Sequence, residues 1–512
     1  MSKSKKLTIS IILMIVFGIL SKSLGLLREI FIAAKFGSGM ETDAFFLALA
    51  AIGLFTSMFT LSINTSIIPI LSEIELNEDR NAKRYHINNI LNIIILISII
   101  VSIIAWISSP YIVNIMGAGF SNEQYELAVL LMKIGMPGLI FAAIVGVYRG
   151  VLQNSQMFLE SSISQFPYNI AFLSYLIFLS GYYGIKGLMV ASIIAIGSQL
   201  FLQIPSLKKL NYKYEFIIDF KDKYFLKMVY LIGPILISVS INDLNKIVDR
   251  ALASGLVEGS ISALNYSARI NSLILAIIIT AISTVLFPVL TKNAMNNNKL
   301  EFKKLVINGT NIITIIIIPI SIVTILLSLP ITQLLFERGE YTTEDSFMTS
   351  NGLIYYTIGL IGMALRTFYE KAFFALHDTK TPMVNGILTV IINIVLNLIL
   401  IGPMEYKGLA LATSIASLIT VIYLFLSLNK KIGNIGIKEI LICLIKVIIA
   451  SIFVFIFIYY SKITFLNNKM IHVNELLIAT LIIAIASFIY VFLLYVLKTK
   501  EIKWFLNLLK QK

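Results

Sequence analysis

The amino-acid sequence predicts an all-α, polytopic membrane protein with fourteen transmembrane helices. Of its 512 residues, 58% are hydrophobic and only 13% are charged. Apolar runs long enough to cross a bilayer recur along the whole chain, and two parts of the chain resemble each other at a fixed offset. We therefore expect two six-helix lobes related by a pseudo-two-fold axis along the membrane normal, followed by two further helices.

This composition also excludes several classes of protein. A mean hydropathy of +0.90 is incompatible with a set of soluble domains, with a disordered chain or with a coiled coil. The single cysteine, Cys443, excludes a scaffold held by intrachain disulfides. An excess of 14 positive charges would suggest nucleic acid as a partner of a soluble protein, but in a membrane protein the position of the charges decides their meaning.

Each predicted span is an apolar run between polar breaks. About 20 helical residues cross a hydrocarbon core of about 30 Å, and several runs exceed this length, so we expect tilted or bent helices. The basic N-terminus before the first run resembles a secretory signal, but no small-residue cleavage site follows, so we expect this run to be retained as a span. The predicted spans are 7–35, 42–72, 87–115, 123–152, 157–182, 185–207, 224–252, 258–292, 301–336, 343–377, 381–402, 405–428, 437–462 and 474–498.

The loops predict the orientation. With both termini in the cytoplasm, the inner segments contain 24 Lys and Arg residues and the outer loops contain six. Cytoplasmic loops of membrane proteins carry such an excess, so we expect both ends inside and an even number of spans. Topology thus explains most of the positive charge, and no nucleic acid is expected as a partner.

An internal repeat predicts the architecture. The stretch YYGIKGLMVASIIA at 182–195 resembles PMEYKGLALATSIA at 403–416, at an offset of 221 residues, and IIPILS at 67–72 resembles LFPVLT at 286–291, at an offset of 219. Chance recurrence in loops that begin helices is the alternative. A duplicated six-helix unit has both copies in the same orientation, which predicts a transporter with a central cavity. The expected division is an N-lobe over 1–222, a C-lobe over 223–430, and two helices with a cytoplasmic tail over 431–512.

Ionisable residues inside predicted spans are candidates for function, because each costs about 2.5 to 3.5 kcal/mol to insert. The first group is Lys22, Arg28 and Glu29 in span 1 with Asp43 at the start of span 2. A cationic cavity surface is one interpretation. The alternative is that Lys22 reaches the interface and that Arg28 pairs with Glu29 or Asp43.

Two further groups follow in the second half of the chain. Span 7 contains four ionisable residues, which either face a cavity or neutralise one another within the helix. These are Asp243, Lys246, Asp249 and Arg250. Arg269 in span 8 has no acidic residue within four positions, which favours an anionic ligand. In span 10, Arg366 and Glu370 are four residues apart, so we expect them to pair.

Motifs for ATP hydrolysis and zinc chemistry are missing from the sequence. It contains no Gly-Lys-Ser/Thr phosphate loop, and its three histidines lie far apart. We therefore expect a transporter rather than an enzyme, without a cofactor and driven by an ion gradient, by the membrane potential or by the gradient of the substrate itself.

Four stretches resemble the MviN/MurJ type of lipid II flippase, within the multidrug/oligosaccharidyl-lipid/polysaccharide exporter superfamily. They are SKSLGLLREIFIAAKFGSGMETDAFF at 21–46, IIPILS at 67–72, DRALASGLVEGSISALNYSARI at 249–270 with FPVLT after it, and FFALHDTKTP at 373–382. The resemblance covers most of the chain, including the two C-terminal helices. It implies a bacterial plasma-membrane protein whose substrate is an undecaprenyl-pyrophosphate-linked disaccharide-pentapeptide.

The resemblance also implies substrate-binding residues. Arg28 and Asp43 match the first motif, and Arg269 matches the position in span 8. Lys22 replaces the usual arginine, which keeps the charge but loses the planar fork suited to phosphate. An arginine that some members carry in span 2 is absent, with only Thr56 and Ser57 near its place. This departure leaves room for another lipid-linked glycan.

A sodium site among helices 7, 11 and 12 occurs in some members of this group. The matching residues here are Asp249, Asn393, Asn397 and Thr413. Oxygen ligands suit a hard cation, but Asn397 stands where an acidic residue is expected, so one formal negative charge remains. The alternative is a pair of amides that hydrogen-bond between helices.

Together these features predict a monomeric flippase that moves lipid II from the inner to the outer leaflet by alternating access, with membrane lipids around it. One alternative is a flippase for another undecaprenyl-linked polysaccharide repeat unit. Another is a cation-coupled drug antiporter, which usually has acidic cavity residues and twelve spans.

Overall fold

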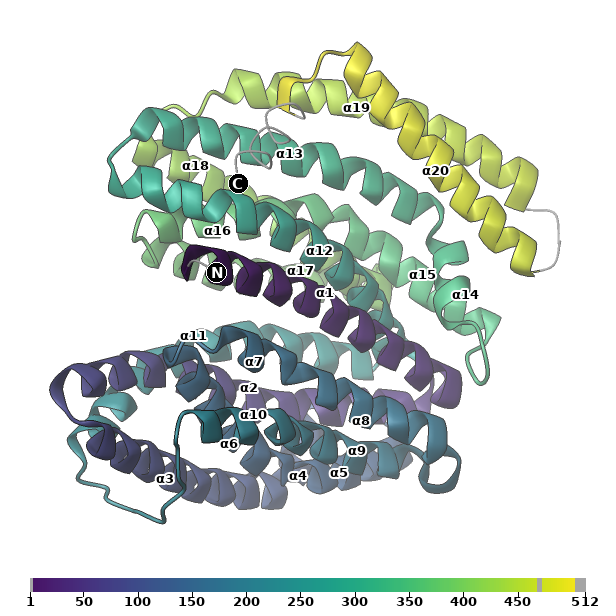
Figure 1. The fold of residues 1–512 in the computed structure, drawn as a ribbon. Helices are drawn as coiled ribbons and strands as arrows, with labels where there is room; N and C mark the ends of the chain where they lie inside the picture. The colour runs from purple at the N-terminus through teal and green to yellow at the C-terminus, as the bar shows by residue number, and fades with distance from the viewer. Residues whose placement is uncertain (1–2, 467–471, 502–512) are drawn as a thin grey trace. The chain divides into compact units, whose positions relative to one another are not determined.

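The computed structural model describes residues 3–466 and 472–501, and within these ranges the chain forms helices and connecting segments without a β-strand (Figure 1). The chain is therefore all-helical, as predicted. The first eleven helices are α1 (Lys3–Phe36), α2 (Met40–Asn77), α3 (Arg80–Ile107), α4 (Ser109–Met116), α5 (Asn122–Gly135), α6 (Gly138–Asn154), α7 (Phe158–Ile163), α8 (Gln165–Phe178), α9 (Ser180–Ser198), α10 (Leu200–Lys209) and α11 (Lys223–Ser254).

The remaining helices follow the same pattern of long and short segments. They are α12 (Ser260–Met295), α13 (Lys299–Leu326), α14 (Ser328–Phe336), α15 (Thr343–Ile358), α16 (Leu360–Ala375), α17 (Lys380–Met404), α18 (Tyr406–Ile432), α19 (Ile437–Ser461) and α20 (His472–Val496), with a π-helical turn at Lys462–Leu466.

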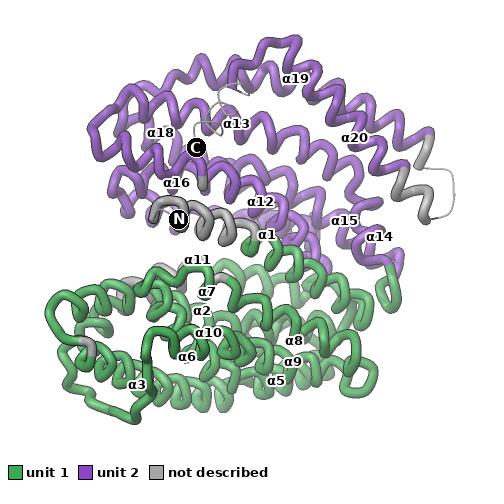
Figure 2. Tube along the Cα trace, viewed as in Figure 1, with its two compact units in different colours: residues 1–262, 338–341 green, residues 263–337, 342–512 purple. Residues whose placement is uncertain are grey.

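Two compact units make up the chain (Figure 2). Unit 1 contains residues 1–262 and 338–341, and unit 2 contains residues 263–337 and 342–512. Unit 1 thus includes α11, whereas the sequence-based division at 222/223 follows the internal repeat. The two units are defined by packing, whereas the sequence-based division is defined by the internal repeat. The units therefore do not test that division, which stays a prediction.

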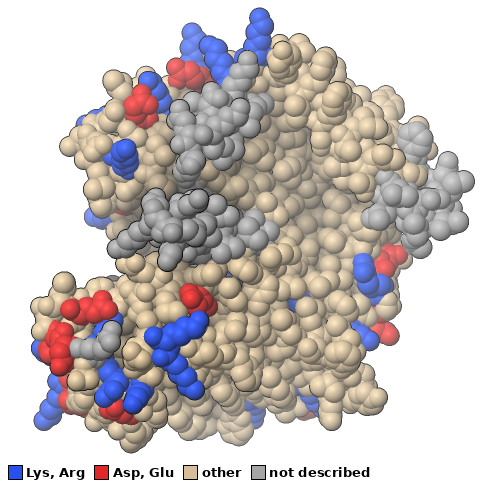
Figure 3. Space-filling view, in the orientation of Figure 1, with Lys and Arg blue, Asp and Glu red and all other residues tan. Residues whose placement is uncertain are grey.

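Within the described ranges, nine helices are long and apolar enough to cross a bilayer, or ten when α5 and α6, bent by 43°, form one span. The chain is therefore a multi-pass membrane protein. In Figure 3 most of the visible surface is neither acidic nor basic, and the charged side chains gather in separate patches.

Breaks within the predicted apolar runs explain why several helices are short. Pro110 lies in the first turn of α4 and separates this helix from α3. Pro137 stands between α5 and α6, and Gly359 between α15 and α16. Proline lacks the backbone donor that a continuous helix needs, and glycine is a weak helix former, so a run of apolar residues is divided at these points.

The two repeated stretches have the same local backbone at matching positions. Gly184 has φ 55° and ψ −154°, and Glu405, 221 residues later, has φ 53° and ψ −138°. This left-handed conformation strains a residue with a side chain, so its occurrence at both places is a specific likeness. Pro69 and Pro288, 219 residues apart, both lie inside long helices.

An asparagine-rich face of α3 holds the segment 211–222 that connects α10 to α11. The amide of Asn92 donates to the carbonyl groups of Glu215 (3.1 Å) and Ile217 (3.0 Å). Asn89 donates to the Asp219 carbonyl at 2.9 Å and accepts from the Asp219 amide at 2.6 Å. Asn88 donates to the Lys213 carbonyl at 3.0 Å. These side chains satisfy backbone groups of a segment that forms neither helix nor sheet.

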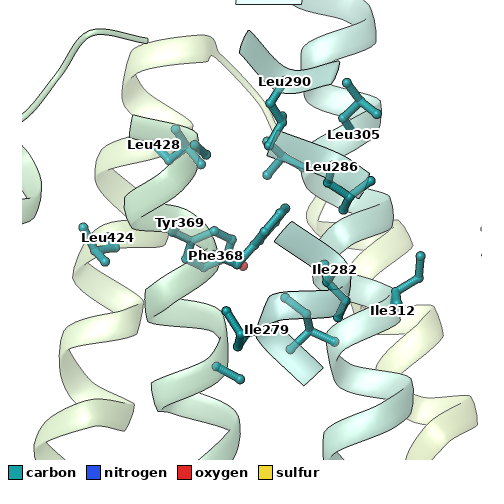
Figure 4. Packing of buried hydrophobic residues seen from close by; sticks show 14 of the residues in the cluster. Ile279, Ile282, Leu286, Leu290, Leu305, Ile312, Phe368, Tyr369, Leu424 and Leu428 are labelled. Carbon is teal, nitrogen blue, oxygen red and sulfur yellow. The ribbon is translucent and has the colours of Figure 1, made fainter. Parts of the chain in front are cut away.

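Apolar side chains hold each unit together. In unit 2, Phe368 and Tyr369 of α16 pack between leucines of α18 and aliphatic residues of α12 (Figure 4). A second cluster joins α13 to α19 and α20, and Tyr490 of α20 donates to the Ile315 carbonyl of α13 at 2.7 Å. Within unit 2, the last two helices are therefore packed against α13 through both apolar and polar contacts.

Candidate functional site

Arg28 is the central residue of the candidate site in unit 1. Its Nη2 donates to Oε1 of Glu29 at 2.7 Å, and the two side chains are only 12% and 6% exposed. Within the described part of the chain, Arg28 Nε and Glu29 Oε2 are buried without a hydrogen-bond partner. The pair therefore neutralises the charge but leaves one donor and one acceptor unused.

Two aromatic rings of α8 cover the Arg28 guanidinium. Its carbon lies 4.9 Å from the centre of the Phe172 ring and 5.6 Å from that of Tyr168. Asn169, between them, donates to the Ser21 carbonyl of α1 at 3.2 Å, which fixes α8 against α1. Such contacts stabilise a desolvated cation by about 2 kcal/mol. The pairing with Glu29 that the sequence left open is thus the arrangement that the structure shows.

Asp43 accepts hydrogen bonds from residues at the start of α12. Its Oδ1 accepts from the Ser262 amide at 2.7 Å and from the Ser262 hydroxyl at 2.5 Å, and its Oδ2 accepts from the Gly259 amide at 2.8 Å. In return, Glu258 accepts from the Met40 amide at the start of α2 at 2.6 Å. Each acid satisfies free donors at the other helix's N-terminus, where negative charge is favourable.

The remaining predicted cations lie on α1, α11, α12 and α16. Lys22 is exposed on α1, and Arg269 is partly buried on α12 in unit 2. Arg250 of α11 donates to the Ile261 carbonyl at 3.0 Å, and Asn245 donates to Asp249 at 3.4 Å. The side chain of Asp243 lies outside the described residues. Arg366 and Glu370 pair at 2.9 Å, which confirms their predicted contact.

Three residues of the predicted sodium site come together in unit 2. Asn397 Nδ2 donates to Asn393 Oδ1 at 2.9 Å, and Asn393 Nδ2 donates to Thr413 Oγ1 at 3.1 Å. This chain links α17 to α18, as in the alternative of hydrogen bonding between helices. Asp249, the fourth predicted ligand, belongs to unit 1. Over residues 3–466 and 472–501, no three His, Cys, Asp or Glu side chains gather as metal ligands.

A polar cavity of about 760 Å³ lies in unit 1, where α2 meets α3. Its lining includes three acidic and three basic residues, and several of them are already paired: Lys83 with Glu75, and Lys223, outside the lining, with Glu78 at 2.7 Å. The hydrogen bond and charge of Lys223 lower the pKa of Glu78. This balance of charge gives the cavity no preference for an anion.

A second buried arginine, Arg149 of α6, was missed by the sequence reasoning. Its Nη2 donates to the Gln199 side-chain oxygen at 3.0 Å, and its Nε is buried without a partner among the described residues. The signal was present, because Arg149 is the sole charged residue between Lys133 and Glu160 in the sequence and falls inside a predicted span.

The fold resembles that of solved membrane transporters. A multidrug-resistance transporter of the MATE family in its inward-facing conformation matches 83% of this chain and 98% of its own, with a TM-score of 0.68 and 13% identity. At this identity the likeness shows the fold alone, that of a polytopic helical bundle.

Sequence comparisons identify the family of this chain more specifically than the fold does. The model of the family "Lipid II flippase MurJ" matches residues 32–496, a range that begins after Arg28. A probable lipid II flippase MurJ from Buchnera aphidicola subsp. Baizongia pistaciae is 30% identical over 448 residues, covering 86% of this chain and 87% of that protein. One from Rickettsia prowazekii is 29% identical over 92% of this chain and 94% of that protein.

A solved structure of the same family agrees. Lipid II flippase MurJ in an inward closed conformation has a TM-score of 0.77 and 27% identity, covering 94% of this chain and 98% of that one. This chain therefore belongs to the lipid II flippase MurJ family. It is a multi-pass protein of the bacterial inner membrane and a member of a transporter family rather than an enzyme family.

Proposed function

We propose that this protein moves lipid II from the inner to the outer leaflet of the bacterial plasma membrane by alternating access. The match to the MurJ family over residues 32–496 carries this proposal. The relatives are named as lipid II flippases over most of their length, and the solved MurJ structure has the same fold. We further propose that the protein is a monomer and that its partners are lipid II, as the substrate, and the surrounding membrane lipids.

The finer architecture is part of the proposal. Fourteen spans, two lobes related by an axis along the membrane normal, and both termini in the cytoplasm fit the loop charges. The matching backbone at Gly184 and Glu405 supports the duplication, because the same uncommon positive-φ conformation occurs at equivalent positions of the two repeats.

The substrate diphosphate would contact Arg28, Lys22 and Arg269, with Asp43 positioning the neighbouring helix end. In this structure Glu29 occupies one face of the Arg28 guanidinium. The diphosphate therefore competes with Glu29 for Arg28, and the unused Nε supplies a further donor. A guanidinium held by aromatic rings stays in place during this exchange.

The driving force we propose is a sodium gradient or the membrane potential. For sodium, Asp249, Asn393, Asn397 and Thr413 would supply oxygen ligands. The hydrogen-bonded chain Asn397–Asn393–Thr413 orients two of these groups toward one another, so binding an ion requires that the amides rotate.

The decisive experiment replaces a depleted native flippase with this protein and measures lipid II accessible from outside the cell. We expect restored accessibility with the wild-type chain and loss with Arg28→Ala or Arg269→Ala. Arg366→Ala is the matched control, because Arg366 already pairs with Glu370 on its own helix. Failure of a correctly inserted wild-type chain, with rescue of a different lipid-linked glycan, would assign the protein to that glycan.

A further inference from the structure

Arg149 is a cation in a membrane helix whose visible partners are neutral amides. Among the described residues, no acidic side chain lies within ion-pairing distance of its guanidinium. Its Nη2 donates a hydrogen bond to the side-chain oxygen of Gln199 at 3.0 Å. An amide accepts a hydrogen bond but carries no net charge, so the positive charge of Arg149 is not compensated there.

The surroundings of Arg149 are polar on several helices at once. The Gln199 oxygen also accepts from Gln165, the first residue of α8, at 3.2 Å. Gln203 of α10 donates to the Val145 carbonyl, one turn from Arg149 on α6, at 3.5 Å. Glutamines at the α9–α10 junction and in α10 thus bond to this part of α6, and Gln165 of α8 bonds to Gln199. None of these side chains carries a charge that could compensate Arg149.

The position of Arg149 along α6 indicates which chemical group could compensate its charge. Arg149 lies five residues before the end of α6 at Asn154, about 8 Å along the helix axis. This is the end that the loop charges place at the inner membrane surface, and α10 finishes there with Lys208 and Lys209. With this predicted orientation, Arg149 is on the part of α6 next to the inner membrane surface, where the phosphate groups of lipids are found.

We propose that Arg149, supported by Gln199 and Gln165, binds the phosphate group of a lipid on the inner side of unit 1. A planar guanidinium matches phosphate oxygens two at a time, and a phosphate removes the cost of an uncompensated cation in the membrane. The unpartnered Nε supplies one of the donors. The lipid is either an anionic phospholipid or a prenyl diphosphate such as the substrate's own headgroup.

The test measures lipid binding directly and does not depend on flipping. Full-length protein in a neutral detergent is titrated at low ionic strength with phosphatidylglycerol, farnesyl diphosphate or inorganic phosphate, and bound adducts are counted by native mass spectrometry. We expect Arg149→Gln to weaken the binding of at least one lipid probe tenfold or more, and Arg149→Lys to weaken it less. Dependence on Arg149 with phosphatidylglycerol alone identifies a bilayer lipid, and with farnesyl diphosphate alone a prenyl diphosphate.

Arg84→Gln is the matched control, because Arg84 belongs to the same unit and pairs with Glu215 at 3.0 Å. We expect it to change lipid binding less than twofold. The Arg149→Lys protein and thermal melting verify that the fold survives. Equal binding by wild-type and Arg149→Gln proteins, absence of lipid binding by the wild type, or an equal loss with Arg84→Gln would each overturn the proposal. A failure of flipping leaves this outcome unaffected, so the two proposals are tested separately.

Discussion

Arg28 and Arg149 are two partly buried arginines of the same unit with opposite surroundings. Arg28 has a carboxylate at 2.7 Å and two aromatic rings around its guanidinium. Arg149 has a neutral amide at 3.0 Å and, in the described part of the chain, no acidic partner. Each keeps an Nε without a hydrogen bond. One site therefore holds a neutralised ion pair, and the other holds a cation without an acidic partner among the described residues.

This difference teaches how an arginine in a membrane can serve two kinds of anion. A cation that is already paired releases its ligand readily, because the internal carboxylate returns when the ligand leaves. An unpaired cation holds a phosphate for longer, since the departure of the phosphate restores the cost of the bare charge. Transient contact suits a transported headgroup, and lasting contact suits a structural lipid.

The largest expected effect is on flipping by a protein with Arg28→Gln and Glu29→Gln together. The double change removes both charges and keeps the buried site neutral. If Arg28 contacts the diphosphate, lipid II accessible from outside falls at least about tenfold, to the level of depleted cells. Restored flipping would mean that Arg28 only neutralises Glu29, and the contrast with Arg149 would lose its functional meaning.

The next effect is on stability. Arg28→Gln alone leaves the Glu29 carboxylate buried without its partner, which should lower the free energy of unfolding by about 3 to 5 kcal/mol. The double change should recover most of this loss. Thermal melting in detergent compares the three proteins, and equal melting of single and double variants would contradict a tight pair.

Arg149→Gln should change the free energy of unfolding in the opposite direction from Arg28→Gln. In detergent without added phospholipid, removal of an uncompensated cation should leave stability unchanged or raise it by about 1 kcal/mol. The same melting experiment measures it. A loss as large as that of Arg28→Gln would show that Arg149 has an acidic partner outside the described residues.

The aromatic contacts of Arg28 can be tested without changing charge. Phe172→Leu keeps an apolar side chain of similar size but removes the ring, and we expect a loss of about 0.5 to 2 kcal/mol in the free energy of unfolding. Tyr168→Phe keeps the ring but removes the hydroxyl that interacts with Arg28, and we expect a smaller loss than with Phe172→Leu. If Phe172→Leu melts like the wild type in the same detergent, the rings contribute packing alone.

The smallest effect concerns an ion pair outside the spans. Although burial alone raises the pKa of Asp378, hydrogen bonds from Lys431 and Thr381 lower it to about 2. A lowered pKa stabilises the fold above the ordinary carboxyl pKa of about 4, and this contribution is lost as the pH falls toward 2. Asp378→Asn should melt slightly earlier than the wild type at pH 6, by less than about 1 kcal/mol, and the two curves should converge near pH 2.

The sequence by itself determined the features that depend on nearest neighbours along the chain. Hydropathy predicted a helical membrane protein, and the spacing of Arg366 and Glu370 predicted their pair, because residues four apart share a helix face. The possibility that Arg28 pairs with Glu29 was likewise visible, since the two are adjacent. The repeat marked Gly184 and Glu405 as equivalent before their backbones were known to agree.

Only the tertiary structure decided which partners distant segments supply. Tyr168 and Phe172 reach Arg28 because Asn169 fixes α8 against α1, nearly 150 residues apart in sequence. Asp43 accepts hydrogen bonds from the start of α12, 219 residues away. Arg149 donates to Gln199, which lies 50 residues further along the chain. A charged side chain inside the membrane needs a partner in the folded protein. The sequence shows that such a charge lies inside a span, but the partner is set by tertiary packing.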